Sequence, residues 1–236
     1  KGTAVYTSAF TPPTAPLTAI TNTTLLLNMA DGQAIDSAAQ TNLTLYNNAK
    51  ISSTQSKFGG TSMYFDGGAD KVIAEGTESL EFGSGNFTIE GWIRPETYTG
   101  TKRSVIAYKW ISGDRAWAIR IHVNSTGFSF RWSWLNDENV GDATLDSTTV
   151  LAWETWHHFA IVNNNGTFTI YSNGTANGTA STGGAIAVSA SPVGFGDWSI
   201  NAADYHGYID DFRISKTARY TSNFTAPTEP FPSKGQ

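Results

Sequence analysis

The chain has 236 residues, 15% of them charged and 13% aromatic, with a formal net charge of −5 and no basic run that would indicate nucleic-acid binding. The absence of cysteine excludes disulfides and thiolate metal sites. No apolar run approaches the roughly 18 residues of a membrane-spanning helix, and the abundance of Gly, Asn, Thr and Ser favours strands and turns.

The first distinct segment, residues 3–16, repeats near the other end of the chain. It is identical to residues 217–230 at ten of fourteen positions, at an offset of 214 residues. Such an offset is a domain length and not a solenoid period. We therefore interpret residues 1–17 as the tail of a preceding repeat, residues 18–216 as one module, and residues 217–236 as its own tail. Convergence of two Thr/Pro-rich linkers is the alternative.

Alternation of apolar and polar residues predicts a series of short strands. From residue 86 onward the period is two, with Phe87, Ile89 and Ile93 on one face of a strand. Residues 117–123 and 128–134 alternate in the same way around a turn, which predicts a hairpin. Residues 156–162 are apolar on both faces, as in a strand that is covered on both sides. Many short strands between turns predict a sandwich or a jelly roll.

Four segments within residues 24–216 resemble, in order, the laminin G-like branch of the concanavalin A-like jelly rolls. They are Met-Tyr-Phe-Asp-Gly at 63–67, Phe-Thr-Ile-Glu-Gly-Trp-Ile-Arg-Pro at 87–95, residues 156–174 from Trp-His-His-Phe to Tyr-Ser-Asn-Gly, and Gly-Tyr-Ile-Asp-Asp-Phe-Arg-Ile at 207–214. The resemblance implies an all-β fold, a two-sheet antiparallel jelly-roll sandwich. It implies no single function, since this fold carries lectins, adhesive modules, enzymes and spacers. It also makes Trp156 and His158 structural residues of the core, with the imidazole hydrogen-bonded inside the sandwich, and we interpret Trp92 as core in the same way.

Catalytic groups are hard to find in this sequence. Glycosidases of this superfamily place two carboxylates side by side on one sheet. The Glu-x-Asp-x-x-Glu spacing is absent, and Glu90 is the single acid of its strand. Asp210 and Asp211 are neighbours that point to opposite faces of theirs. We therefore expect that the chain is not an enzyme.

Aspartates are the candidate metal ligands. Asp210 shares a strand face with apolar residues, and a buried carboxylate is costly unless it is hydrogen-bonded or bound to a cation. The resemblance implies a structural calcium ion, with Asp66, Asp70 and Asp210 as its ligands. That Asp210 instead accepts main-chain N–H bonds is the alternative. His157 and His158 are adjacent on a strand and therefore cannot share one ion.

Tryptophans in expected loops are the candidate sugar contacts, because exposed aromatic rings stack on the apolar faces of sugars. Two loops combine a tryptophan with charged residues, which gives the candidate carbohydrate-binding residues Trp110, Asp114, Arg115, Asp197 and Trp198. Tryptophans that alternate within strands, at 117, 132 and 134, are expected in the core.

We therefore predict a non-enzymatic carbohydrate-binding or adhesive module of an extracellular, cell-surface or virion-surface protein. Its expected partners are a glycan or polysaccharide and neighbouring repeats, with no nucleic acid and no membrane insertion. The alternative is a structural or decorative repeat that spaces or assembles a phage appendage, fibre or surface layer. Because Tyr6, Phe10, Tyr220 and Phe224 are too apolar for flexible spacers, we expect both tails to dock on a jelly roll.

Overall fold

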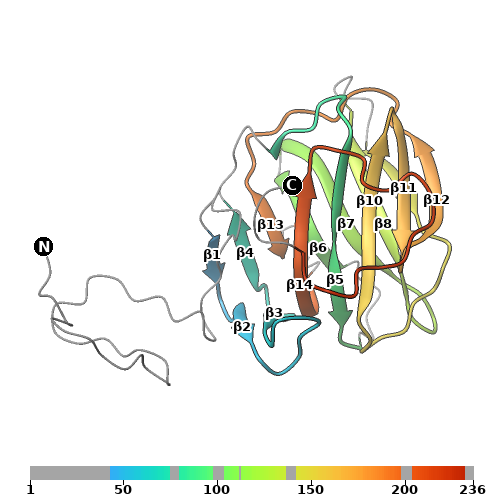
Figure 1. Cartoon of the computed structure of the whole chain (residues 1–236). Helices are drawn as coiled ribbons and strands as arrows, with labels where there is room; N and C mark the ends of the chain where they lie inside the picture. The colour runs from blue at the N-terminus through green and yellow to red at the C-terminus, as the bar shows by residue number, and fades with distance from the viewer. Residues whose placement is uncertain are drawn as a thin grey trace, which may run out of the picture.

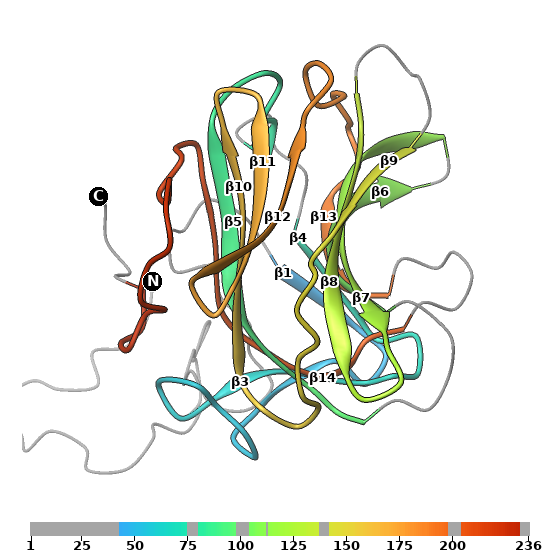
Figure 2. The same cartoon turned by 90° about the vertical axis from the view of Figure 1, so that its right-hand side faces the viewer.

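The computed structural model describes residues 43–74, 80–97, 104–111, 113–136, 142–197 and 204–231. These residues form two antiparallel sheets of seven strands each, which confirms the predicted jelly-roll sandwich. Figure 1 shows one sheet in front of the other, and Figure 2 shows the two layers nearly edge-on. Within the described ranges there is no helix long and apolar enough to cross a membrane.

Each sheet is assembled from strands that are distant in sequence. The first sheet contains, in spatial order, β1 (Leu43–Tyr46), β4 (Lys71–Ala74), β13 (Val193–Gly196), β6 (Ser104–Ile111), β7 (Asp114–Val123), β8 (Phe128–Leu135) and β9 (Asp142–Asp146). The second sheet contains β12 (Thr175–Ser181), β11 (Thr167–Ser172), β10 (His157–Asn164), β5 (Phe87–Pro95), β14 (His206–Ser215), β3 (Ser62–Asp66) and β2 (Lys50–Ser52).

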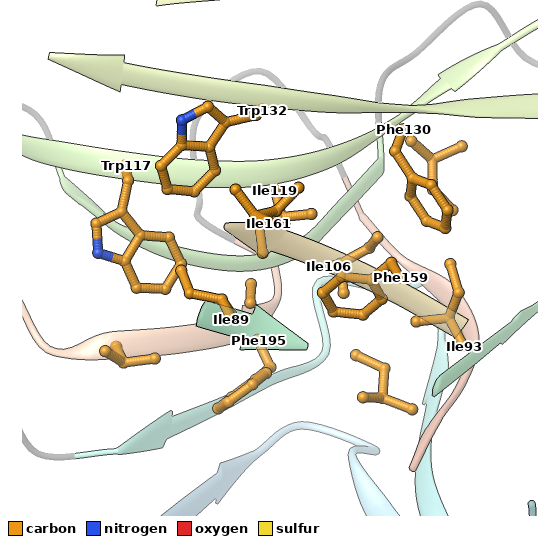
Figure 3. Close-up of a cluster of buried hydrophobic side chains, with 14 of the residues drawn as sticks. Ile89, Ile93, Ile106, Trp117, Ile119, Phe130, Trp132, Phe159, Ile161 and Phe195 are labelled. Carbon is orange, nitrogen blue, oxygen red and sulfur yellow. The ribbon is translucent and has the colours of Figure 1, made fainter. Parts of the chain in front are cut away.

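The hydrophobic core lies between the two sheets. Figure 3 shows Ile89 and Phe159 of the second sheet among Trp117 and Trp132 of the first. The two indole rings stack with their centroids 5.9 Å apart, and the side chain of Trp132 is fully buried. The predicted hairpin is confirmed, since Trp117 on β7 pairs with Trp134 on β8. The strand tryptophans are core residues because every second side chain of these strands points inward.

The second sheet is also covered on its outer face, by the C-terminal segment. We call residues 217–231 the C-terminal strap; they run back over β5, β10 and β11 (Figures 1 and 2). Ala160 and Val162 of β10 face the strap, while Phe159 and Ile161 face the core. The strand was correctly predicted to be covered on both sides, and the cover on one side is the chain's own tail.

Three of the aromatic residues that were assigned to the core lie elsewhere. Trp92 and His158 are buried on the outer face of the second sheet, where their ring centroids are 5.3 Å apart. Trp156 is only partly buried, because it precedes β10 and lies before the strand alternation begins. The tryptophan of this segment that packs on the core is Trp153, 5.0 Å from the ring of Phe128.

This assignment predicts different costs for two tryptophan substitutions. Trp132→Ala leaves a large cavity between the sheets and should lower the free energy of unfolding by about 3–5 kcal/mol. Trp156→Ala removes a partly exposed ring and should cost less than about 2 kcal/mol. Urea unfolding of both variants, followed by fluorescence, measures the two losses. Equal losses of unfolding free energy for the two variants would indicate that Trp156 is a core residue.

Candidate functional site

Three of the predicted sugar-binding residues meet at the end of one hairpin. Trp110 of β6 pairs with Arg115 of β7, and Ile111 pairs with Asp114. Asp197 directly follows β13, which pairs with β6 nearer the other end of that strand. Its carbonyl oxygen accepts a 2.6 Å hydrogen bond from the Tyr108 hydroxyl. Trp198 lies outside the described residues.

Trp110 is not the exposed loop residue that the sequence predicted. It belongs to strand β6 and is only 4% exposed, so its ring is not free to stack on a sugar. Trp110 follows Tyr108 by two residues on the same strand, and its ring lies beside Tyr108 on the outer face of the first sheet. The guanidinium carbons of Arg115 and Arg120 lie 5.4 and 5.5 Å from the ring centroid. The indole therefore positions two arginines by cation–π contact.

A row of polar side chains continues from Arg120 across the outer face of the first sheet. Arg120 pairs with Arg131, which in turn pairs with Asp146. The Arg131 guanidinium donates to both carboxylate oxygens of Asp146, at 2.5 Å each. His122 Nδ1 lies 3.8 Å from the same carboxylate, and the side chains of His122 and Asp146 are each 39% exposed. We call Arg120, His122, Arg131 and Asp146 the polar row.

Small side chains form the floor beside the polar row. Ala118 pairs with Tyr108 on one side and with Ser133 on the other. The hydroxyl of Ser133 is fully buried and makes no hydrogen bond with the described atoms around it. The indole N–H groups of the core residues Trp117 and Trp132 are likewise buried without a partner in the described part of the chain, so the hydroxyl of Ser133 does not by itself mark a site. The sequence signal for this site is the alternation of Arg120, His122 and Arg131 with apolar residues in the predicted hairpin, and it was not interpreted as a site.

The outer face of the second sheet holds a buried ionic centre around Glu90. Its Oε1 atom accepts hydrogen bonds from Nε and Nη2 of Arg213, at 3.0 and 2.7 Å. Its Oε2 atom accepts a 2.8 Å bond from the hydroxyl of Tyr220, and Nε2 of His158 lies 3.5 Å away. Burial by itself raises the pKa of the Glu90 carboxyl, but the approach of His158 and the bonds from Arg213 hold it below the ordinary value of 4.5.

The surroundings of Glu90 do not form a glycosidase pair. Its contacts in the described structure are guanidinium, imidazole and hydroxyl groups, whereas glycoside hydrolysis needs a second carboxyl group nearby. Asp210 is engaged elsewhere: its Oδ2 atom accepts the main-chain N–H groups of Lys57 and Phe58, at 2.7 and 3.0 Å. This is the hydrogen-bonded alternative that the sequence left open for Asp210.

The three aspartates proposed for calcium do not come together. Asp66 and Asp70 share one turn, where Oδ2 of Asp70 accepts the main-chain N–H of Asp66 at 2.7 Å. Asp66 pairs across the sheet with His206, four residues before Asp210, which corresponds to about 13 Å along the strand. One ion therefore cannot bind all three. The fit to calcium narrows to the Asp66–Asp70 turn, where the carboxylate of Asp66 is exposed.

The Glu90 centre predicts a loss of stability in acid. Because the pKa of Glu90 is lower in the folded chain, its ionised form stabilises the fold above about pH 4.5, and this contribution disappears as the pH falls further. The difference in unfolding free energy between wild type and Glu90→Gln, measured with denaturant, should be smaller at pH 3.5 than at pH 7. The exposed strap residue Glu229 supplies the control, and Glu229→Gln should follow wild type at both values. A pH-independent gap for Glu90→Gln would contradict the proposed role of its charge.

Comparison with solved structures finds proteins of the same fold, at sequence identities that show no closer relationship than the fold. A receptor-binding domain of botulinum neurotoxin mosaic serotype C/D matches with a TM-score of 0.58 and 16% identity, over 76% of this chain and 43% of that one. The serotype D binding domain matches with a TM-score of 0.57 and 16% identity, over 75% and 44%. A serotype DC binding domain gives 0.58 and 17%, over 75% and 43%. The chain thus spans less than half the length of these proteins.

The family is given by a sequence model. No curated protein sequence matches the chain. The model of the family Laminin_G_3, described as the concanavalin A-like lectin/glucanases superfamily, matches residues 66–222, about two-thirds of the chain. The matched range contains both the polar row and the Glu90 centre. This chain belongs to the Laminin_G_3 family of concanavalin A-like lectins and glucanases.

Proposed function

We propose that the chain is a non-enzymatic carbohydrate-binding or adhesive module that takes a glycan on the outer face of its first sheet. The observation that carries the proposal is the polar row, in which the side chains of His122 and Asp146 are each 39% exposed. Sugar hydroxyls both donate and accept hydrogen bonds, so they match a face that combines guanidinium, carboxylate, imidazole and hydroxyl groups. A module of this kind would act outside a cell or on a virion surface.

Two structural neighbours support a glycan as the ligand class. The botulinum neurotoxin DC binding domain was determined in complex with SialylT. Cell entry of botulinum neurotoxin type C depends on interaction with two ganglioside molecules. At 16–17% identity these proteins share the fold with this chain, so the support concerns the class of ligand and not its identity.

The non-enzymatic part of the proposal rests on the second sheet. Glu90 is the acid of the central strand β5, and it is fully buried beneath the strap. A general acid or nucleophile must reach its substrate, and here Arg213 and Tyr220 occupy both carboxylate oxygens. This arrangement favours a structural role for the one strand carboxylate that the sequence singled out.

A glycan array with the whole chain tests the function. Arg120→Ala and His122→Ala alter the polar row and should weaken binding about tenfold or more, since a hydrogen bond to a charged group contributes roughly 1.5–3 kcal/mol. Lys50→Ala, an exposed change on the other sheet, is the matched control and should leave binding unchanged. Melting curves check that all variants fold.

A blank array would contradict the proposal and favour the alternative, a structural or decorative repeat. The alternative has an observation of its own, the tail that is packed onto the module. Binding that survives in Arg120→Ala and His122→Ala but disappears in Lys50→Ala would instead move the glycan to the second sheet.

We also propose calcium binding at the Asp66–Asp70 turn. Calcium takes 6–8 oxygen ligands, of which the exposed carboxylate of Asp66 can supply a part and water the remainder, while Asp70 holds the turn through the N–H groups of Asn48 and Asp66. An ion that binds only the folded chain raises its stability, by about 2.7 kcal/mol at a hundredfold excess over the dissociation constant. Millimolar calcium should therefore raise the melting temperature relative to chelator, and Asp66→Asn should abolish the difference. Identical wild-type curves in calcium and chelator would exclude the site.

A further inference from the structure

The strap is attached to the second sheet by two stacked aromatic rings. The rings of Tyr220 and Phe224 lie parallel, with centroids 3.5 Å apart. Both contact Tyr171 of β11, at 6.2 and 5.3 Å between centroids, and Phe224 meets His158 edge-on at 5.7 Å. The Tyr220 hydroxyl reaches Glu90 beneath the strap. The strap thus makes a specific contact at the aromatic positions of its sequence.

Main-chain contacts fix the strap on either side of these rings. The hydroxyl of Thr88 donates to the carbonyl of Thr217 at 2.8 Å and accepts the N–H of Arg219 at 3.0 Å. The N–H of Phe224 donates to the carbonyl of Gly174 at 2.9 Å. A side chain at Gly174 would collide with the carbonyl of Phe224, so the strap approaches this turn at backbone distance. The outer face of the second sheet therefore contacts the main chain of the strap as well as its two aromatic rings.

The same contact residues recur at the start of the chain. In the alignment of residues 3–16 with 217–230, Tyr6 corresponds to Tyr220 and Phe10 to Phe224. Among the four differences, Val5 replaces Arg219 and Ala9 replaces Asn223. In residues 217–230, Asn223 accepts the N–H of Ala176 at the margin of the site. Arg219 donates to the Ser215 hydroxyl, and its Nε atom lies 3.8 Å from Oε1 of Glu90. The tyrosine and the phenylalanine are therefore retained in residues 3–16, whereas the arginine near Glu90 is lost, which is expected to make this segment the weaker ligand.

We propose that the outer face of the second sheet is a binding site for a Thr-Ala-x-Tyr-Thr-Ser-x-Phe-Thr segment, and that residues 3–16 are a second ligand for this site. In this chain, residues 217–231 occupy the face. Residues 3–16 would therefore bind the same face of another module of this kind. In each module, a segment of this sequence would then cover the outer face of the second sheet. This inference does not depend on the glycan proposal, which concerns the opposite sheet.

The position of Glu90 makes the recognition selective for tyrosine. In the described structure its Oε2 atom accepts the hydroxyl of the bound tyrosine, while Arg213 neutralises the charge from the other side. Removing the hydroxyl leaves a buried charge with one partner fewer, which is unfavourable. A Tyr6→Phe peptide should therefore bind more weakly than the native peptide, even though the ring is kept.

The test uses the full chain with its own strap released. A cleavage site for a specific protease, inserted after the exposed residue Lys216, allows the strap to be cut after folding. Fluorescent peptides of residues 3–16 and 217–230 are then titrated against the cut chain, and binding is followed by anisotropy. Both should bind, with the 217–230 peptide tighter. Double substitution of Tyr6→Ala and Phe10→Ala should weaken the first peptide at least tenfold, and the uncut chain should bind neither peptide well.

Each outcome is decisive. If the 217–230 peptide binds and the 3–16 peptide does not, the assignment of residues 3–16 as a second ligand is wrong. If neither binds although the cut strap has left the folded chain, the face is not a binding site for a separate segment. If the cut strap stays bound, Tyr220→Ala with Phe224→Ala is introduced to release it, and the titration is repeated; failure of both peptides there also overturns the proposal. Circular dichroism confirms folding in every case.

Discussion

The buried carboxylate of Glu90 is the constraint on which the outer half of this structure depends. It lies on the central strand of the second sheet and is fully removed from solvent. A charge in that position is strongly unfavourable unless several partners surround it. Arg213 supplies two hydrogen bonds from β14, and Tyr220 supplies one from the strap. The strap is therefore part of the fold, because it provides both the cover and one of the partners of the charge.

This constraint makes the two outer faces of the sandwich different. The second sheet is closed by the strap, and the carboxylate of its Glu90 is bonded to Arg213 and Tyr220. The first sheet keeps His122 and Asp146 partly exposed. A shared fold does not assign a function, so the difference between the faces is the relevant evidence. From this difference we infer that a ligand binds the first sheet, whereas the second sheet binds a segment of protein chain.

A bulge in β14 lets three neighbouring charged residues contact three different parts of the structure. The register with β5 shifts between Asp210 and Arg213, and Asp211 adopts a positive φ of 48°. As a result Asp210 binds the loop at Lys57, Arg213 reaches Glu90, and both carboxylate oxygens of Asp211 accept the N–H of Phe231 at the end of the strap. Burial raises the pKa of Asp211 to about 6, so ionising this group opposes the folded state increasingly as the pH rises from about 4 to 6.

The sequence by itself determined the architecture, because strand alternation and the four family segments are local signals. They identified the inward tryptophans, the β7–β8 hairpin and the covered strand β10, and the repeated tyrosine and phenylalanine correctly predicted a docked tail at Tyr220 and Phe224. Tyr6 and Phe10 lie outside the described residues, so their docking stays a prediction.

Only the tertiary structure decided which side chains meet. Trp110 lies within strand β6 and is buried, Trp156 lies one residue before β10 and remains outside the core, and the register of β14 against β3 separates Asp210 from Asp66. The contact of Tyr220 with Glu90 joins residues 130 positions apart. Periodicity reports the face on which a side chain lies, whereas register and long-range cover decide what that face touches.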